Sequence, residues 1–69
     1  MPKYRVGDHV SWNSEAGLAS GEITSILEED FFFKGYIHHA SVEEPQYEIK
    51  SDKTDHVAVH KESALSRKS

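Results

Sequence analysis

The sequence predicts an all-β domain, a small barrel of five or six short strands. Apolar and polar residues alternate with a period of two in three separate runs, as in half-buried strands. Turn-forming residues separate these runs, and no segment shows the sustained apolar period of a helix. Strands this short bury their apolar faces by curling into a barrel, which also limits exposed sheet edges.

The first half of the chain predicts two strands joined by a loop. Residues 8–13 alternate between apolar and polar side chains and form the first strand. A second extended run covers residues 18–27. Ile23 and Ile26 differ in parity within this run, which predicts a β-bulge or a sharp bend in a twisted strand.

The middle of the chain predicts a hairpin and a short helical turn. Three consecutive phenylalanines at residues 31–33 form a strand that folds back, at the following Lys-Gly pair, onto residues 36–39. Residues 41–44 fit a capping box and predict one helical turn. Pro45 ends that turn, because the residue before a proline avoids the helical conformation.

The last third of the chain predicts two more strands and a 3₁₀ turn. Residues 46–50 and 56–60 alternate cleanly, and the two valines of the second run are expected to face inward. Residues 62–64 predict the 3₁₀ turn, and residues 66–69 are expected to fray. Seven apolar side chains make up the predicted core: Val10, Ile23, Tyr47, Ile49, Val57, Val59 and Leu65.

Length and composition limit the class of protein. A chain of 69 residues forms one domain at most, and we expect a single SH3-like barrel over residues 1–69, with an ordered core at about residues 4–66. The absence of cysteine excludes a disulfide scaffold, a zinc finger and a cysteine nucleophile. The longest apolar run is about three residues, so we expect a soluble, cytoplasmic protein without membrane contact.

The net charge of −4 is unevenly distributed. Residues 1–12 sum to +1, residues 13–49 to −7 and residues 50–69 to +2. A chain without a basic stripe lacks the Lys/Arg–phosphate contacts on which nucleic-acid binders depend, so nucleic acid is not the expected partner. The acidic middle of the chain favours a basic partner instead.

Several blocks of the sequence resemble one protein family. Residues 6–13 (Val-Gly-Asp-His-Val-Ser-Trp-Asn) are similar to the start of many Tudor, KOW and SH3-like barrels. More specific blocks follow at Lys34-Gly35-Tyr36, His39-Ala40-Ser41, residues 44–54, His60-Lys61 and Ala64-Leu65. Together they resemble the small family of hypervirulence-associated proteins with a Tudor-like domain. The resemblance implies a single Tudor-like barrel, found in bacteria and fungi as a domain of unknown function, and supplies no catalytic residue.

Aromatic side chains are the main candidates for a binding site. Four of the seven aromatic residues lie within residues 31–36, and the central phenylalanine must point away from its two neighbours. Tudor-like barrels can build an aromatic cage for methylated ammonium groups through cation–π attraction. We therefore expect a site for a protein or peptide with a cationic group, built from Trp12, Phe32, Tyr36, Tyr47, Asp52 and Asp55.

Two alternatives to this site remain open. Trp12 and Tyr47 are also suited to fill the core, since a barrel this small needs its largest side chains inside. The turn that carries Asp52 and Asp55 is also suited to be a solvated hairpin loop with local hydrogen bonds.

Other chemistry has little support in the sequence. His56 and His60 share one face of a strand but lie about 13 Å apart, too far for one metal ion. Neither a G-x-S-x-G elbow nor a glycine-rich phosphate loop is present. We therefore expect no enzyme activity, no metal and no cofactor.

The expected function is that of a small Tudor-like binding or adaptor module for a protein or peptide, acting as a monomer or weak homodimer. The alternative is a nucleic-acid-associated barrel of the KOW kind. Its phosphate contacts would come from Lys3, Arg5, Lys50, Lys53, Lys61, Arg67 and Lys68.

Overall fold

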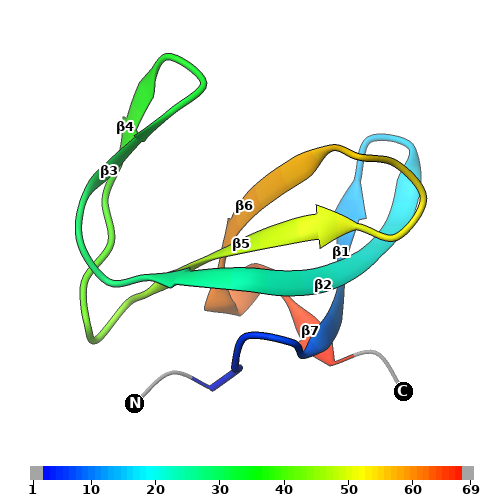
Figure 1. Ribbon diagram of the computed structural model, residues 1–69, viewed down its shortest axis with the longest axis horizontal. Helices are drawn as coiled ribbons and strands as arrows, with labels where there is room; N and C mark the ends of the chain where they lie inside the picture. Colours follow the sequence, from blue (N-terminus) through cyan, green and yellow to red (C-terminus); the bar gives the residue numbers. More distant parts are fainter. Residues whose placement is uncertain (1–2, 68–69) are drawn as a thin grey trace.

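The computed structural model describes residues 3–67 and confirms the all-β fold class (Figure 1). Within these residues there are seven strands and a 3₁₀ turn (η1), with no α-helix. Their bounds are β1 (His9–Ser14), β2 (Gly17–Leu27), β3 (Phe31–Phe33), β4 (Tyr36–His38), β5 (Gln46–Ser51), β6 (Val57–Lys61), η1 (Glu62–Ala64) and β7 (Ser66–Arg67). No helix in the described part of the chain is long and apolar enough to cross a membrane.

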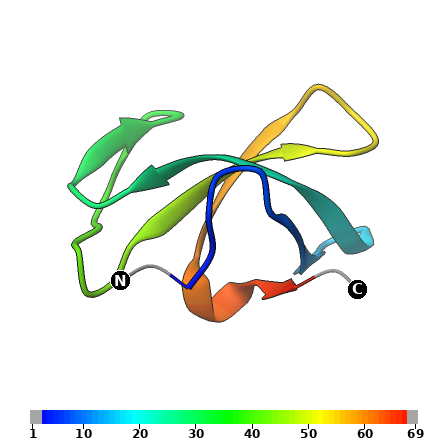
Figure 2. The ribbon, with the colours of Figure 1, turned by 60° about the horizontal axis from the view of Figure 1, so that its bottom comes forward.

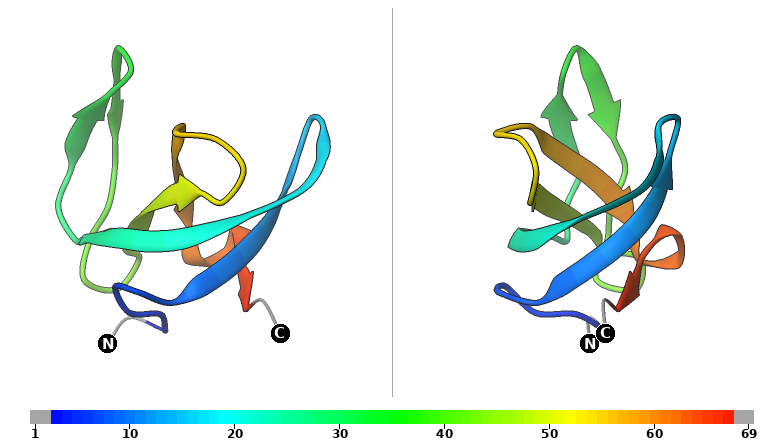
Figure 3. Two further views of the ribbon diagram at one scale, coloured as in Figure 1. Left: turned by 45° about the vertical axis from the view of Figure 1, so that its right-hand side comes forward. Right: turned by 90° about the vertical axis from the view of Figure 1, so that its right-hand side faces the viewer.

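Five of the strands form one strongly curved antiparallel sheet in the order β6-β5-β2-β1-β7 (Figure 3). Among the described residues, the edge strands β6 and β7 are not paired with each other, so the sheet curls like a barrel without closing. Figure 2 shows the N-terminal segment (blue) passing across the opening of this curved sheet, with η1 and β7 below it.

The expected fraying of residues 66–69 is wrong for residues 66–67. These two residues form β7 and pair with Val10 and Ser11 of β1. The side chain of Arg67 also reaches Asp8, with Nη1 3.5 Å from Oδ2. The open edge of β1 has backbone N–H and C=O groups that can pair with a further strand, and η1 directs residues 66–67 toward this edge. Their position near the end of the sequence does not reveal this pairing. Residues 68–69 lie outside the described residues.

The predicted irregularity in the second strand is confirmed as a β-bulge. The register of β2 against β5 shifts between Ile23 and Ser25, which leaves Thr24 as the extra residue. Its hydroxyl group donates to the Glu48 carbonyl oxygen at 3.2 Å and to the Glu48 carboxylate at 3.0 Å. Because one residue is skipped, Ile23 and Ile26 face the same side of the sheet despite their opposite parity.

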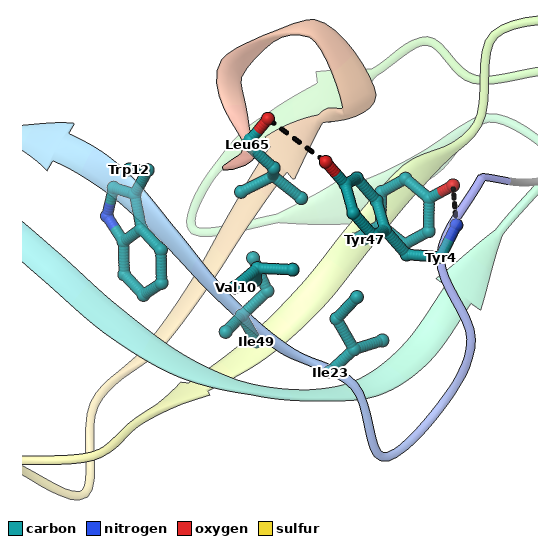
Figure 4. Close-up of a cluster of buried hydrophobic side chains, with 7 residues drawn as sticks. All are labelled: Tyr4, Val10, Trp12, Ile23, Tyr47, Ile49 and Leu65. Carbon is teal, nitrogen blue, oxygen red and sulfur yellow. Dashed lines mark hydrogen bonds between the residues drawn. The ribbon is translucent and has the colours of Figure 1, made fainter. Parts of the chain in front are cut away.

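The buried core confirms five of the seven predicted side chains and adds two aromatic rings. Its members, drawn in Figure 4, are Tyr4, Val10, Trp12, Ile23, Tyr47, Ile49 and Leu65. The inward orientation expected for Val57 and Val59 is wrong, since neither belongs to the core cluster or packs against it.

The register between β5 and β6 explains this error. Tyr47 pairs with His60, and Ile49 pairs with Ala58. Residues directly opposite each other in an antiparallel pair share one face, so Ala58 and His60 point to the core side. The two valines of β6 therefore point to the other face.

The β3–β4 hairpin is separate from the barrel and is inserted between β2 and β5 (Figure 1). Its turn consists of Lys34 (φ 51°) and Gly35 (φ 85°). Positive φ at both central residues is the signature of the type I′ turn that suits two-residue hairpins. The predicted hairpin is thus confirmed.

The helical turn expected at residues 41–44 is wrong. The Glu44 N–H donates to the Ser41 hydroxyl group and the Ser41 N–H donates to the Glu44 carbonyl oxygen, both at 3.1 Å. The capping contact is present, but residues 42–44 form a bend. Pro45 follows and has no N–H to close a helical turn on the Ser41 carbonyl group.

Candidate functional site

The structure places the six residues of the predicted site in three separate places. Trp12 and Tyr47 are buried in the core, with 7% and 0% of their surface exposed. Phe32 and Tyr36 are in the hairpin, with 73% and 74% exposed. The two aspartates, Asp52 and Asp55, are in the turn between β5 and β6. Because β5 runs from the base of the hairpin to that turn, the exposed rings and the aspartates lie at opposite ends of one strand (Figure 1).

The two buried aromatic residues have other side chains as neighbours. The Trp12 ring lies 5.2 Å from the His60 ring, and the Tyr47 ring meets the Tyr4 ring edge to face at 5.5 Å. The Tyr47 hydroxyl group donates to Glu62 Oε2 at 2.9 Å. Both rings therefore fill the core, the alternative that the sequence also allows, and the four aromatic residues of the predicted site do not meet in one cage.

Burial changes the acid–base chemistry of two side chains in this core. Loss of solvent raises the pKa of the Tyr47 hydroxyl group, and its contact with the Glu62 carboxylate acts in the same direction. Loss of solvent also lowers the pKa of His60, because burial disfavours the imidazolium form. Burial thus favours the protonated hydroxyl group of Tyr47 and the neutral imidazole of His60, whose ring packs on Trp12.

Asp52 ties its turn to the rest of the sheet. Its Oδ1 lies 3.5 Å from His9 Nε2, and its Oδ2 accepts a hydrogen bond from the Ser20 hydroxyl group at 3.1 Å. The Asp52 N–H also donates to the Ser20 carbonyl oxygen at 3.0 Å. Asp52 and Asp55 are both exposed. These contacts fit the role of a local hydrogen-bonded turn better than that of a rim beside an aromatic wall.

Phe32 and Tyr36 lie on opposite faces of the hairpin. Phe32 pairs with Ile37, and Phe33 pairs with Tyr36. Paired residues share a face and neighbouring residues alternate, so Phe32 and Ile37 form one face, while Tyr36 belongs to the other. The expectation that Tyr36 lies beside Phe32 is therefore wrong. Ile37, which is 65% exposed, takes that place and was missed.

The two faces of the hairpin differ in how well they are covered. On the face of Tyr36, the His38 ring stacks on Phe31 at 5.1 Å and meets the edge of Phe33 at 5.9 Å. These three side chains are half-buried. Phe32 and Ile37 on the other face are mostly exposed, so this is the open apolar face of the hairpin.

A shallow depression of about 520 Å³ lies at the base of the hairpin. Its apolar lining comes from Ile26, Leu27, Phe31 and Val42, and its polar lining consists of the carboxylates of Glu28, Glu29 and Asp30. No basic side chain lines it in the part of the chain that the structure describes. The arrangement suits a partner that combines an apolar side chain with a cationic group.

Hydrogen bonds fix the base of the hairpin. Asp30 Oδ2 lies 3.3 Å from His39 Nδ1, and Asp30 Oδ1 accepts from the Ala40 N–H at 3.2 Å. The buried Gln46 side chain donates from Nε2 to the His39 carbonyl oxygen at 2.9 Å. These bonds link both ends of the hairpin to each other and to the first residue of β5.

Two of the seven basic residues expected for a nucleic-acid surface lie beside carboxylates. Lys3 and Lys61 line a depression of about 420 Å³ together with Glu43, Glu44 and Glu62. Carboxylates beside the lysines weaken the attraction for phosphate. Within residues 3–67, no group of three or more His, Cys, Asp or Glu side chains is arranged to hold a metal ion.

The curved five-stranded sheet around one apolar core, with a 3₁₀ turn before its last strand, defines a small SH3-like β domain. Comparison with known families identifies it further. Residues 7–65 match the family described as the hypervirulence associated proteins TUDOR domain, and because this match spans most of the 69 residues, the chain belongs to that family. No curated protein and no solved structure matches the chain. The matched region includes the hairpin and the barrel strands β1, β2, β5 and β6.

Proposed function

We propose that this Tudor domain is a small binding or adaptor module that recognises a protein or peptide, with the β3–β4 hairpin as its contact surface. The observation that carries the proposal is the exposure of Phe32, Tyr36 and Ile37, each at least 65% exposed, on a hairpin that projects from the barrel (Figure 3). Apolar and aromatic side chains gathered on a protruding segment are typical of interaction sites.

The position of the core residues outside the hairpin supports this proposal. None of the seven core residues comes from residues 28–45. The barrel is therefore a scaffold that does not depend on the hairpin side chains for its core, and these side chains are available to a partner. Loops and insertions on a rigid scaffold are where binding residues usually lie.

Charge indicates the chemistry of the partner. Glu28 and Glu29 are exposed at the base of the hairpin, and both line the depression beside Phe31 and Val42. Two carboxylates beside an apolar surface favour a peptide in which Lys or Arg stands near an apolar side chain. The cationic group expected from the sequence thus belongs beside Glu28 and Glu29 rather than beside Asp52 and Asp55.

A random peptide library displayed on phage tests the proposal. We expect selection on the immobilised domain to enrich sequences that combine apolar residues with Lys or Arg. For the tightest selected peptide, Phe32→Ser should raise the dissociation constant about 10-fold or more, as truncation of an aromatic anchor does.

Leu18→Ser is the matched control, because Leu18 is also 73% exposed but lies at the far end of β2. We expect this variant to bind the peptide with unchanged affinity. Selection that enriches no peptide, or a peptide that tolerates Phe32→Ser, would contradict the proposed function.

A further inference from the structure

The hairpin has unpaired strand edges. Within residues 3–67, β3 and β4 pair only with each other and form a two-stranded sheet of three residues on each side. An isolated two-stranded sheet is marginally stable in water, and each of its outer edges presents free N–H and C=O groups. Such an edge is a template for a further strand.

The turn geometry shows which backbone groups face outward. In a hairpin with a two-residue turn, the pair that flanks the turn exchanges hydrogen bonds, and the next pair directs its N–H and C=O groups away from the partner strand. Phe33 and Tyr36 flank the turn, so Phe32 and Ile37 form that next pair. Phe32 therefore combines a free backbone edge with a ring that is 73% exposed.

The edge of β3 is more open than the edge of β4. Beyond β4, the His39 carbonyl oxygen accepts from Gln46 and the Ala40 N–H donates to Asp30. The backbone groups that follow β4 thus already form hydrogen bonds within this chain. Before β3, residues 28–30 line the apolar and acidic depression, so the open edge of β3 leads directly into it.

We propose that the partner binds by strand addition, as an extended cationic peptide paired along the outer edge of β3. This inference rests on the proposed function and adds the mode of binding. The peptide backbone pairs with the N–H and C=O groups of Phe32. Its alternate side chains pack on Phe32 and Ile37 or enter the depression at Phe31 and Val42, and its Lys or Arg side chain lies beside Glu28.

Charge favours a cationic peptide over a second copy of the chain. Five carboxylates bracket the hairpin, and residues 13–49 carry a net charge of −7. Two copies joined along β3 would bring these like charges together, whereas a basic peptide would compensate them. The bracketing carboxylates are those of Glu28, Glu29, Asp30, Glu43 and Glu44.

An N-methyl scan of the tightest peptide from the phage library tests strand addition. Methylation removes one backbone N–H at a time and leaves the side chains in place. We expect one position, whose N–H bonds the Phe32 carbonyl oxygen, to weaken binding about 10-fold or more when methylated. The positions on either side of it should change binding less than about 3-fold, because neighbouring residues of an added strand point their N–H groups away from the sheet.

Hydrogen exchange of the domain provides a second readout. The Phe32 amide should exchange more slowly when the peptide is bound, while the amide of Leu18 serves as the unaffected reference. A peptide that depends on Phe32 but tolerates N-methylation at every position would overturn strand addition and leave the proposed function intact. Sedimentation of the free domain as a dimer that Phe32→Ser dissociates would instead make a second copy the occupant and overturn the inference.

Discussion

The backbone N–H of Tyr4 donates to the hydroxyl oxygen of Tyr47 at 3.4 Å, and the two rings meet edge to face, with centroids 5.5 Å apart (Figure 4). The Tyr4 hydroxyl group in turn donates to the Leu65 carbonyl oxygen at 3.2 Å. Tyr4 thus connects the start of the chain to β5 and to the residue before β7. An N-terminal residue that precedes every strand is therefore part of the core.

The contacts of Tyr4 predict two different losses of stability. Tyr4→Phe keeps the ring and removes one hydrogen bond, so the free energy of unfolding should fall by about 1 kcal/mol. Tyr4→Ala also empties a fully buried site and should cost about 3–5 kcal/mol. Urea denaturation followed by tryptophan fluorescence measures both. Equal losses for the two variants would contradict the role assigned to the ring.

A methyl group at Gly21 should destabilise the sheet. An added Cβ would overlap the Lys50 carbonyl oxygen and approach Cγ2 of Ile49 to 2.8 Å, so β2 and β5 would have to separate. We expect Gly21→Ala to cost about 1–3 kcal/mol in thermal or urea unfolding. Glu22→Ala, at the exposed neighbouring position, is the control and should change stability by less than about 0.5 kcal/mol.

The hairpin and the core should respond differently to truncation of an aromatic ring. Phe32→Ala should change the free energy of unfolding by less than about 0.5 kcal/mol, because its ring is 73% exposed. Tyr47→Ala should cost about 3–5 kcal/mol, because its ring is fully buried. Thermal melts of the two variants make the comparison. A large loss for Phe32→Ala would show that its ring is structural and would remove the support for the binding surface.

His60 should make the domain less stable in acid. Burial lowers its pKa below the ordinary value of 6.5, so the folded form binds a proton less readily than the unfolded chain. As the pH falls through 6.5, the unfolded chain gains a proton first and the free energy of unfolding decreases, until the pH also passes the lowered pKa of the folded form.

The variant His60→Gln isolates this effect from that of the other titratable groups. Urea midpoints at about pH 7.5 and about pH 5 should differ less in the variant than in the unmodified protein. An equal difference in the two proteins would mean that His60 does not contribute to the acid response.

Local patterns were sufficient to predict most of the strands. Alternation identified β1 and β5, and the change of parity between Ile23 and Ile26 revealed the bulge, because each signal depends on neighbouring residues. The relation between Phe32 and Ile37 was also available from the sequence. A two-residue turn at Lys34-Gly35 sets the register of the strands that flank it, and this register pairs Phe32 with Ile37.

Contacts between distant segments account for the errors. Alternation in β6 defines two faces but does not show which one is inward, and the turn from residue 52 to residue 56 is too long to set the register. The register places the small Ala58 opposite Ile49 and His60 opposite Tyr47, so β5 supplies the large buried side chains of this pair of strands. Tyr4 pairs with a residue 43 positions away, which no local pattern indicates.

Leu27 and Gln46 are paired across β2 and β5, so the segment of residues 28–45 leaves and re-enters the sheet at neighbouring points. The pairing of β2 with β5 holds the two ends of this segment close together. The entropic cost of closing a loop changes only slowly with the length of the loop. We therefore expect that this segment can be shortened, lengthened or exchanged for another loop while the barrel keeps its register. The seven core residues and the residues of this segment thus lie on different stretches of the same short chain.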